Sequence, residues 1–70
     1  MNGYANAETN FAAVNILNIE SLYISARRMT NSFALRNMFV DAVEAGIIAG
    51  MHIEVENVDF DEILDAVLDD

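Results

Sequence analysis

Residues 31–46, NSFALRNMFVDAVEAG, carry the clearest structural signal in the chain. The polar residues 30–32 offer three side chains that can cap a helix, and Gly46 is a typical helix stop. The pattern between them predicts the longest helix of the protein over residues 33–45. Its apolar positions recur at helical spacing and form one face: Leu35, Met38, Phe39, Ala42 and Val43.

The rest of this helix combines a polar side with two apolar residues outside the main face. Arg36, Asp41 and Glu44 mark the side that meets solvent. Phe33 and Val40 lie off the apolar face, so either they pack under a neighbouring helix or they are exposed for a partner. The sequence leaves both alternatives open.

The N-terminal part of the chain predicts a first, short helix. Asn6 or Thr9 can cap it, and we expect it to run to about Leu17. Phe11, Val14 and Leu17 would face inward. Three asparagines in this segment are poor formers of helix interiors, so tertiary packing rather than helix propensity must hold it.

A second helix is expected directly after the first. Asn18 is its predicted N-cap, and Arg27 and Arg28 fall near its C-terminus, where positive charge complements the helix dipole. Its apolar positions recur at i, i+3, i+4, i+7 and i+10: Ile19, Leu22, Tyr23, Ala26 and Met29.

The C-terminal part predicts a short extended segment and a last helix. Apolar and acidic residues alternate near 52–56, which suits a brief extended stretch. Asp59 and Glu62 have the spacing of a capping box at the start of the helix that follows. The predicted inward face of that helix is Ile63, Leu64, Val67 and Leu68.

These elements predict an all-α fold, a compact bundle of three or four short helices, in a single domain over residues 1–70. With 70 residues and 54% hydrophobic content, the chain is too short for a second domain and too apolar to be disordered throughout. A domain of this size buries only about 60% of the surface that its unfolded chain exposes. Its stability would therefore be marginal, and dimerisation would help it.

Charge is distributed unevenly along the chain. The net charge is −9; residues 1–36 carry +1 and residues 37–70 carry −10. This balance argues against direct binding to nucleic acid or to an anionic membrane surface, and it makes a basic protein the natural partner. No apolar run approaches the roughly 20 residues that cross a bilayer, and the N-terminus lacks a signal-peptide pattern. We therefore expect a soluble, cytoplasmic protein.

Residues that could carry catalysis or bind a metal ion are scarce. The chain has no cysteine, and its one histidine, His52, lies far in sequence from the serines at positions 21, 25 and 32. His52 is expected at the surface, with a pH-sensitive contact as the less favoured interpretation. Counted from Asp59, a calcium loop of the EF-hand kind fails because Ile63 and Leu64 occupy its fifth and sixth positions. We expect no enzymatic activity, no catalytic residues, no cofactor and no metal site.

The acidic C-terminal part has two interpretations. Asp61, Asp65 and Asp69 recur every four residues, which places them about 6 Å apart along one helix face. They form either a solvated face with a frayed tail or a contact surface for the phosphate-binding groove of a basic protein. In the second interpretation the partner-binding residues are Glu54, Glu56, Asp59, Asp61, Glu62, Asp65 and Asp69.

Two segments of the chain carry recognisable motifs. The first includes Gly3, Tyr4, Asn6, Glu8, Thr9, Ala13, Ile16, Asn18, Glu20, Leu22 and Tyr23, and the second is VDFDEI at residues 58–63. They resemble, without a gap in the first, a family of small proteins from phages and other mobile elements. The family's opening reads G-Y-x-N-Y-E-T-W-N-V-A-L-W-I-x-N-D-E-x-L-Y, and V-D-W-x-E-I lies near its C-terminus. Here Asn10 and Asn15 replace both tryptophans of the opening, and Ile19 replaces its aspartate.

The resemblance implies an origin more than a mechanism, because the family is largely without an assigned activity. Small acidic proteins of such elements often inhibit host defence, and they include anti-CRISPR and anti-restriction proteins, some of which imitate DNA. The leading hypothesis is therefore an anti-CRISPR protein, bound through its acidic C-terminal face to a basic nucleic-acid-binding host protein such as a CRISPR effector subunit. The alternative is a small dimeric adaptor, structural or regulatory, that binds through an apolar face including Phe33 and Val40.

Overall fold

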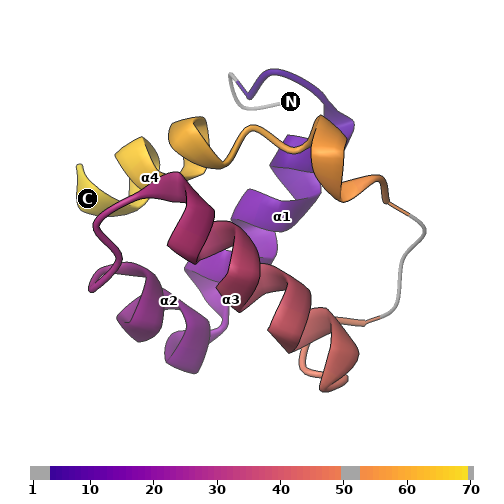
Figure 1. Cartoon of the computed structure of the whole chain (residues 1–70), viewed down its shortest axis with the longest axis horizontal. Coiled ribbons are helices and arrows are strands. Elements are labelled where there is room, and N and C mark those ends of the chain that lie inside the picture. Colours follow the sequence, from indigo (N-terminus) through magenta and orange to yellow (C-terminus); the bar gives the residue numbers. More distant parts are fainter. Residues whose placement is uncertain (1–3, 50–52, 70) are drawn as a thin grey trace.

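Four α-helices and one 3-10 turn make up the computed structural model, which describes residues 4–49 and 53–69 (Figure 1). The elements are α1 (Ala7–Asn18), α2 (Glu20–Ala26), α3 (Ser32–Glu44), η1 (Val55–Asn57) and α4 (Phe60–Leu68). The part of the chain that is described contains no strand. The prediction of an all-α bundle is confirmed.

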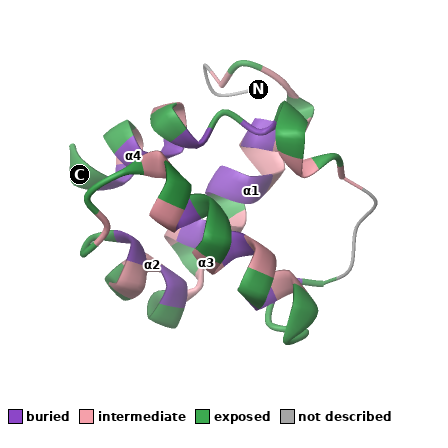
Figure 2. Ribbon diagram, viewed as in Figure 1, coloured by how far each residue is buried: buried purple, intermediate pink, exposed green. Residues whose placement is uncertain are grey.

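The core lies between α1, α3 and α4, with α2 closing one side (Figures 1 and 2). The rings of Phe39 and Phe60 bring α3 and α4 together, with 5.7 Å between their centroids and a tilt of 59°, a favourable geometry for an aromatic pair. The largest side chains that are fully enclosed come from all parts of the chain: Phe39, Ile16, Leu35, Ile48, Ile63 and Val67.

Helix α1 buries a different face from the predicted one. Val14 is 44% exposed, and Phe11 and Leu17 are only partly buried, so the prediction is wrong for Val14. Helix α1 is packed against α2, α4 and η1. Short side chains on its buried face let these neighbours approach closely, and that face consists of Thr9, Ala12, Ala13 and Ile16.

Helix α2 begins without the predicted cap. The side-chain amide of Asn18 donates to the carbonyl of Val14 at 2.8 Å, so it bonds the preceding turn instead of the next helix. Ile19 occupies the N-cap position in an extended conformation and makes no side-chain cap bond. The predicted apolar stripe is confirmed, since Leu22 and Ala26 are buried and its other members are partly buried.

Helix α3 follows its prediction to within one residue at each end. Asn31 is the cap, and its Oδ1 accepts a hydrogen bond from the Ala34 N–H at 2.8 Å. Gly46 ends the helix with a φ of +78°, a conformation that glycine adopts without strain. The predicted core face is confirmed by the buried residues Leu35, Phe39 and Ala42.

Helix α4 begins at the predicted place and turns one predicted core residue outward. Asp59 is its N-cap and accepts from the Glu62 N–H at 3.1 Å. Leu68 is 52% exposed, so its predicted inward position is wrong. Leu64, at 9% exposure, already lies at the edge of the buried face, and four further residues rotate a helix position by another 40° or so.

Within the described residues 53–56 of the predicted extended segment, residues 55 and 56 belong to η1, whereas Glu54 before them is extended. The Asn57 N–H bonds the Glu54 carbonyl at 2.9 Å, and the Val58 N–H bonds the Val55 carbonyl at 3.1 Å. An isolated strand would leave these groups without a partner, and a tight turn satisfies them locally. Residue 52, and with it the expectation for His52, lies outside the described residues.

Candidate interaction surfaces

Polar contacts join the first turn of α1 to the segment that leads into α4. Thr9 is fully buried, and its Oγ1 accepts from the Asp59 N–H at 2.9 Å. Asn6 accepts from the Thr9 N–H at 2.7 Å through Oδ1 and donates from Nδ2 to the Asn57 carbonyl at 2.8 Å. The first turn of α1 and residues 57–59 are therefore in direct contact, which gives Asn6 and Thr9 a structural role.

Two carboxylates belong to the same set of contacts. Glu8 Oε2 accepts from the Glu54 N–H at 3.1 Å and from Asn57 Nδ2 at 3.3 Å. Glu62 Oε1 accepts from the Ala5 N–H at 2.9 Å. Glu62 therefore stabilises the N-terminal segment and does not complete a reciprocal capping box with Asp59. None of these long-range contacts was predicted from the sequence.

The seven predicted partner-binding acids fall into two groups. Asp59 and Glu62 bond the chain's own backbone, as helix cap and as anchor for residue 5. The other five are exposed, and their carboxylates make no hydrogen bond or ion pair within the described parts of the chain: Glu54, Glu56, Asp61, Asp65 and Asp69.

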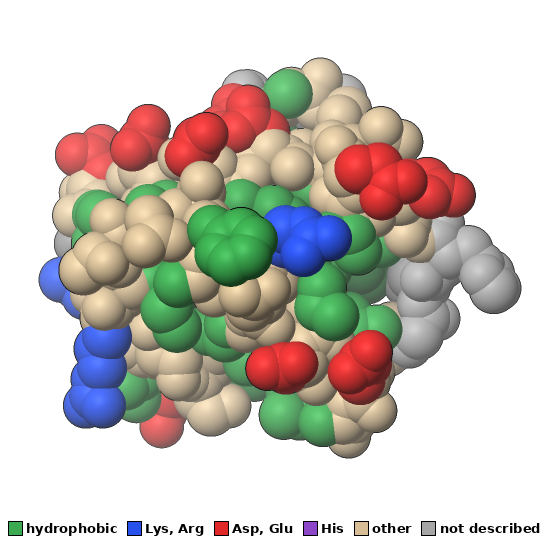
Figure 3. Space-filling view, in the orientation of Figure 1, with side chains coloured by type: hydrophobic (Ala, Val, Ile, Leu, Met, Phe, Trp, Pro, Cys, Tyr) green, Lys and Arg blue, Asp and Glu red, His purple; other side chains and the backbone are tan. Residues whose placement is uncertain are grey.

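The exposed acids do not form one continuous track. Asp61 and Asp65 lie on successive turns of α4 and Asp69 is its C-cap, whereas Glu54 is the N-cap of η1 and Glu56 lies within it. In Figure 3 acidic side chains line the upper edge over α4, and a second group over η1 is separated from them by neutral surface. The structure thus confirms the row on α4 as an exposed face but places the two η1 glutamates apart from it.

A shallow hollow of about 460 Å³ lies within the α4 row. It is lined by Asp65, Ala66, Leu68 and Asp69. The exposed Leu68 adds an apolar side chain to the hollow beside the two carboxylates. A lysine or arginine side chain suits such a place, because its aliphatic stem can cover the leucine while its charged end meets the carboxylates.

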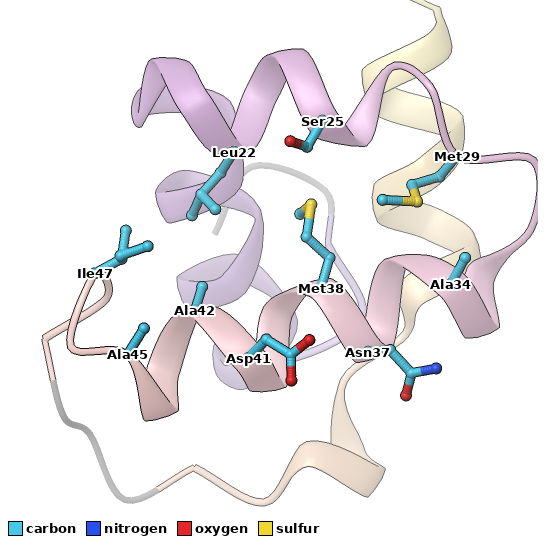
Figure 4. A pocket seen from close by; sticks show the side chains of 10 residues that line it. All are labelled: Leu22, Ser25, Met29, Ala34, Asn37, Met38, Asp41, Ala42, Ala45 and Ile47. Atoms are coloured by element: carbon cyan, nitrogen blue, oxygen red, sulfur yellow. The ribbon is translucent and has the colours of Figure 1, made fainter.

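An apolar groove of about 580 Å³ runs between α2 and α3 (Figure 4). Helix α2 and the loop after it contribute Leu22, Ser25 and Met29, and Met38 of α3 points into it from the other side. Asp41 lies at its edge. The groove results from the way two helices meet, so no local sequence pattern signals it.

The three arginines lie at the C-cap of α2, in the loop after it and on α3. Arg27 Nη1 donates to the Tyr23 hydroxyl at 2.9 Å, and its guanidinium lies 5.7 Å from the centre of the same ring. Arg28 and Arg36 are exposed. Among residues 4–49 and 53–69, no three acidic or histidine side chains are grouped so that they could hold a metal ion. No helix of that part is long and apolar enough to cross a membrane.

Comparison with known proteins yields no relative. No protein-family model matches the chain, and neither a curated protein nor a solved structure matches it.

Proposed function

We propose that this protein is a non-enzymatic inhibitor of host defence made by a phage or mobile element, and specifically an anti-CRISPR protein. It acts by covering a basic nucleic-acid-binding surface of a host effector. The observation that supports this proposal is the row of Asp61, Asp65 and Asp69 on α4, whose carboxylates are exposed and make no bond to residues 4–49 and 53–69. The origin in a mobile element rests on the resemblance of residues 3–23 and 58–63.

The row offers both charge and a place for a side chain. Three carboxylates on successive turns attract the lysines and arginines that otherwise hold phosphates, which speeds association. Leu68 lies beside them at 52% exposure and supplies apolar contact. Asp59 and Glu62 hold α4 in place through their bonds to the backbone. The partner contacts the exposed acids.

Binding to a purified CRISPR effector tests the proposal. We expect the wild-type chain to bind the effector in competition with its nucleic acid, and the affinity to fall at least about tenfold between 50 and 500 mM salt. Asp61→Lys/Asp65→Lys should abolish binding. Glu20→Lys/Asp41→Lys changes the net charge equally at exposed positions outside α4 and should bind like the wild type once salt is fixed.

Two outcomes contradict the charge mechanism: an affinity that does not change with salt, or equal loss in both double variants. Absence of binding to every effector tried favours the second candidate, a dimeric adaptor. That candidate is supported by the exposure of Phe33, whose side chain is 68% accessible.

A further inference from the structure

Helix α3 has a second, outward face. Its members follow the spacing i, i+3, i+4, i+7, i+8 and i+11 and are Phe33, Arg36, Asn37, Val40, Asp41 and Glu44. All are exposed except Val40, which is partly buried. In Figure 3 hydrophobic side chains and a basic one lie together over α3, and acidic side chains lie below them, toward its C-terminal end. This face carries a large apolar residue and a cation at one end and anions at the other.

The charges on this face have no partner on their own helix. Ion pairs on a helix surface need opposite charges three or four residues apart. The residues at those distances from Arg36 are Ser32, Phe33, Phe39 and Val40, and none is acidic. Arg36 and Glu44 also form no ion pair elsewhere in the described chain.

We propose that this outward face is the interface of a homodimer, in which the α3 helices of two copies pack antiparallel about a twofold axis at Val40. Each residue of a helix advances the chain by about 1.5 Å, so Arg36 and Glu44 lie about 6 Å from Val40 in opposite directions. Antiparallel packing therefore brings Arg36 of each copy level with Glu44 of the other. The twofold symmetry makes this pair twice.

The shapes of the two ends match in the same arrangement. Phe33 lies about 10 Å from the axis, which places it over the end of the other copy's α3. That end carries Ala45 and Gly46, and a Cβ built on Gly46 would meet no atom within 4 Å. The small residues leave room for the aromatic ring, so the largest exposed apolar side chain of one copy covers the end of α3 in the other.

This surface fits a second copy better than an unrelated protein, because Arg36 and Glu44 are placed symmetrically about Val40. It is also separate from the acidic row on α4, so the dimer and the proposed inhibitor function can fail independently. One helix pair is a small interface, and we expect a dissociation constant on the order of 10 μM.

Sedimentation equilibrium with a charge swap tests the pairing. Arg36→Glu and Glu44→Arg, each alone, should weaken the dimer by at least about tenfold, because each replaces two attractions by two repulsions. The double variant Arg36→Glu/Glu44→Arg has the wild-type net charge and should restore it. A wild-type chain that stays monomeric at 500 μM, or a dimer that the single reversals leave unchanged, would overturn the proposal.

A single cysteine tests the position of the axis, since the chain has none of its own. Val40→Cys should form a disulfide-linked dimer under mild oxidation, because a residue on a twofold axis lies opposite its own copy. Val14→Cys, at an exposed position on α1, serves as the control and should cross-link much more slowly. Equal rates for the two variants would show that any dimer uses another surface. Circular dichroism of each variant confirms that helix content is retained.

Discussion

At the scale of single residues, Thr9 joins the first turn of α1 to the start of α4. Its hydroxyl oxygen is buried and accepts from the Asp59 N–H, while its own N–H donates to Asn6. The Asp59 N–H precedes the first turn of α4, where the helix itself offers no acceptor. The hydroxyl oxygen of Thr9, 50 positions earlier in the chain, is the acceptor instead.

Replacing this hydroxyl by a methyl group should destabilise the protein with little change in shape. We expect Thr9→Val to lower the free energy of unfolding by about 1–3 kcal/mol, because the N–H of Asp59 would lose its acceptor at a partly buried position. Urea denaturation measures the loss. The chain's other threonine, Thr30, is exposed, so Thr30→Val should leave the urea midpoint almost unchanged. Equal effects would refute a specific role for the Thr9 hydroxyl.

At the scale of elements, the ends of α3 follow from single residues, whereas helix faces depend on neighbours. Asn31 and Gly46 set the ends of α3 as predicted, since capping and positive φ are local properties. The inward face of α1 was predicted wrongly at Val14. Its apolar residues occur on more than one side, and contact with α2, α4 and η1 selected the side with alanines.

The end of α3 offers a test of backbone conformation without a change in packing. Gly46→Ala should cost about 1 kcal/mol of unfolding free energy, since alanine is strained at a φ of +78°. The added methyl group meets nothing within 4 Å, so no clash contributes. The neighbour Ala45 has a φ of −81°, and Ala45→Gly should cost no more than a few tenths. Chemical denaturation in dilute solution, below the expected dimer concentration, compares the two; a neutral Gly46→Ala would contradict the conformational argument.

At the scale of the whole molecule, charge opposes folding while apolar packing drives it. The net charge is −9, and ten of the twelve acids follow residue 37. The fold brings some of the twelve acids, such as Glu8 and Glu62, near backbone N–H groups. It leaves the α4 row facing solvent without a counter-charge among the described residues. Such a molecule is stabilised by anything that screens like charges.

Salt should therefore raise the melting temperature. Between about 20 and 500 mM sodium chloride we expect a rise of several degrees, since about 1 kcal/mol corresponds to 4–8 °C in a domain of this size. Asp61→Asn/Asp65→Asn should melt higher than the wild type at low salt and respond less to added salt. A melting temperature that is flat in salt would show that the acids are too dispersed to repel one another.

The candidate binding surface on α4 was only partly predictable from the sequence. A spacing of four places Asp61, Asp65 and Asp69 on one face of any helix, so their common exposure follows from the sequence once α4 is recognised. The engagement of Glu62 with residue 5 depends on how α1 and α4 pack, as does the separation of Glu54 and Glu56 from the row. The groove between α2 and α3 also depends on how the helices pack, so no sequence pattern predicted it.

The local features of the fold follow from the sequence. They are the all-α class, the caps at Asn6, Asn31 and Asp59, the end of α3 at Gly46 and the core face of α3. These depend on interactions across a few positions, which composition and spacing reveal. Packing settled the buried face of α1, the bond of Glu62 to residue 5 and the contact of Thr9 with Asp59. Each of these depends on groups far apart in the chain, whose meeting no local pattern encodes.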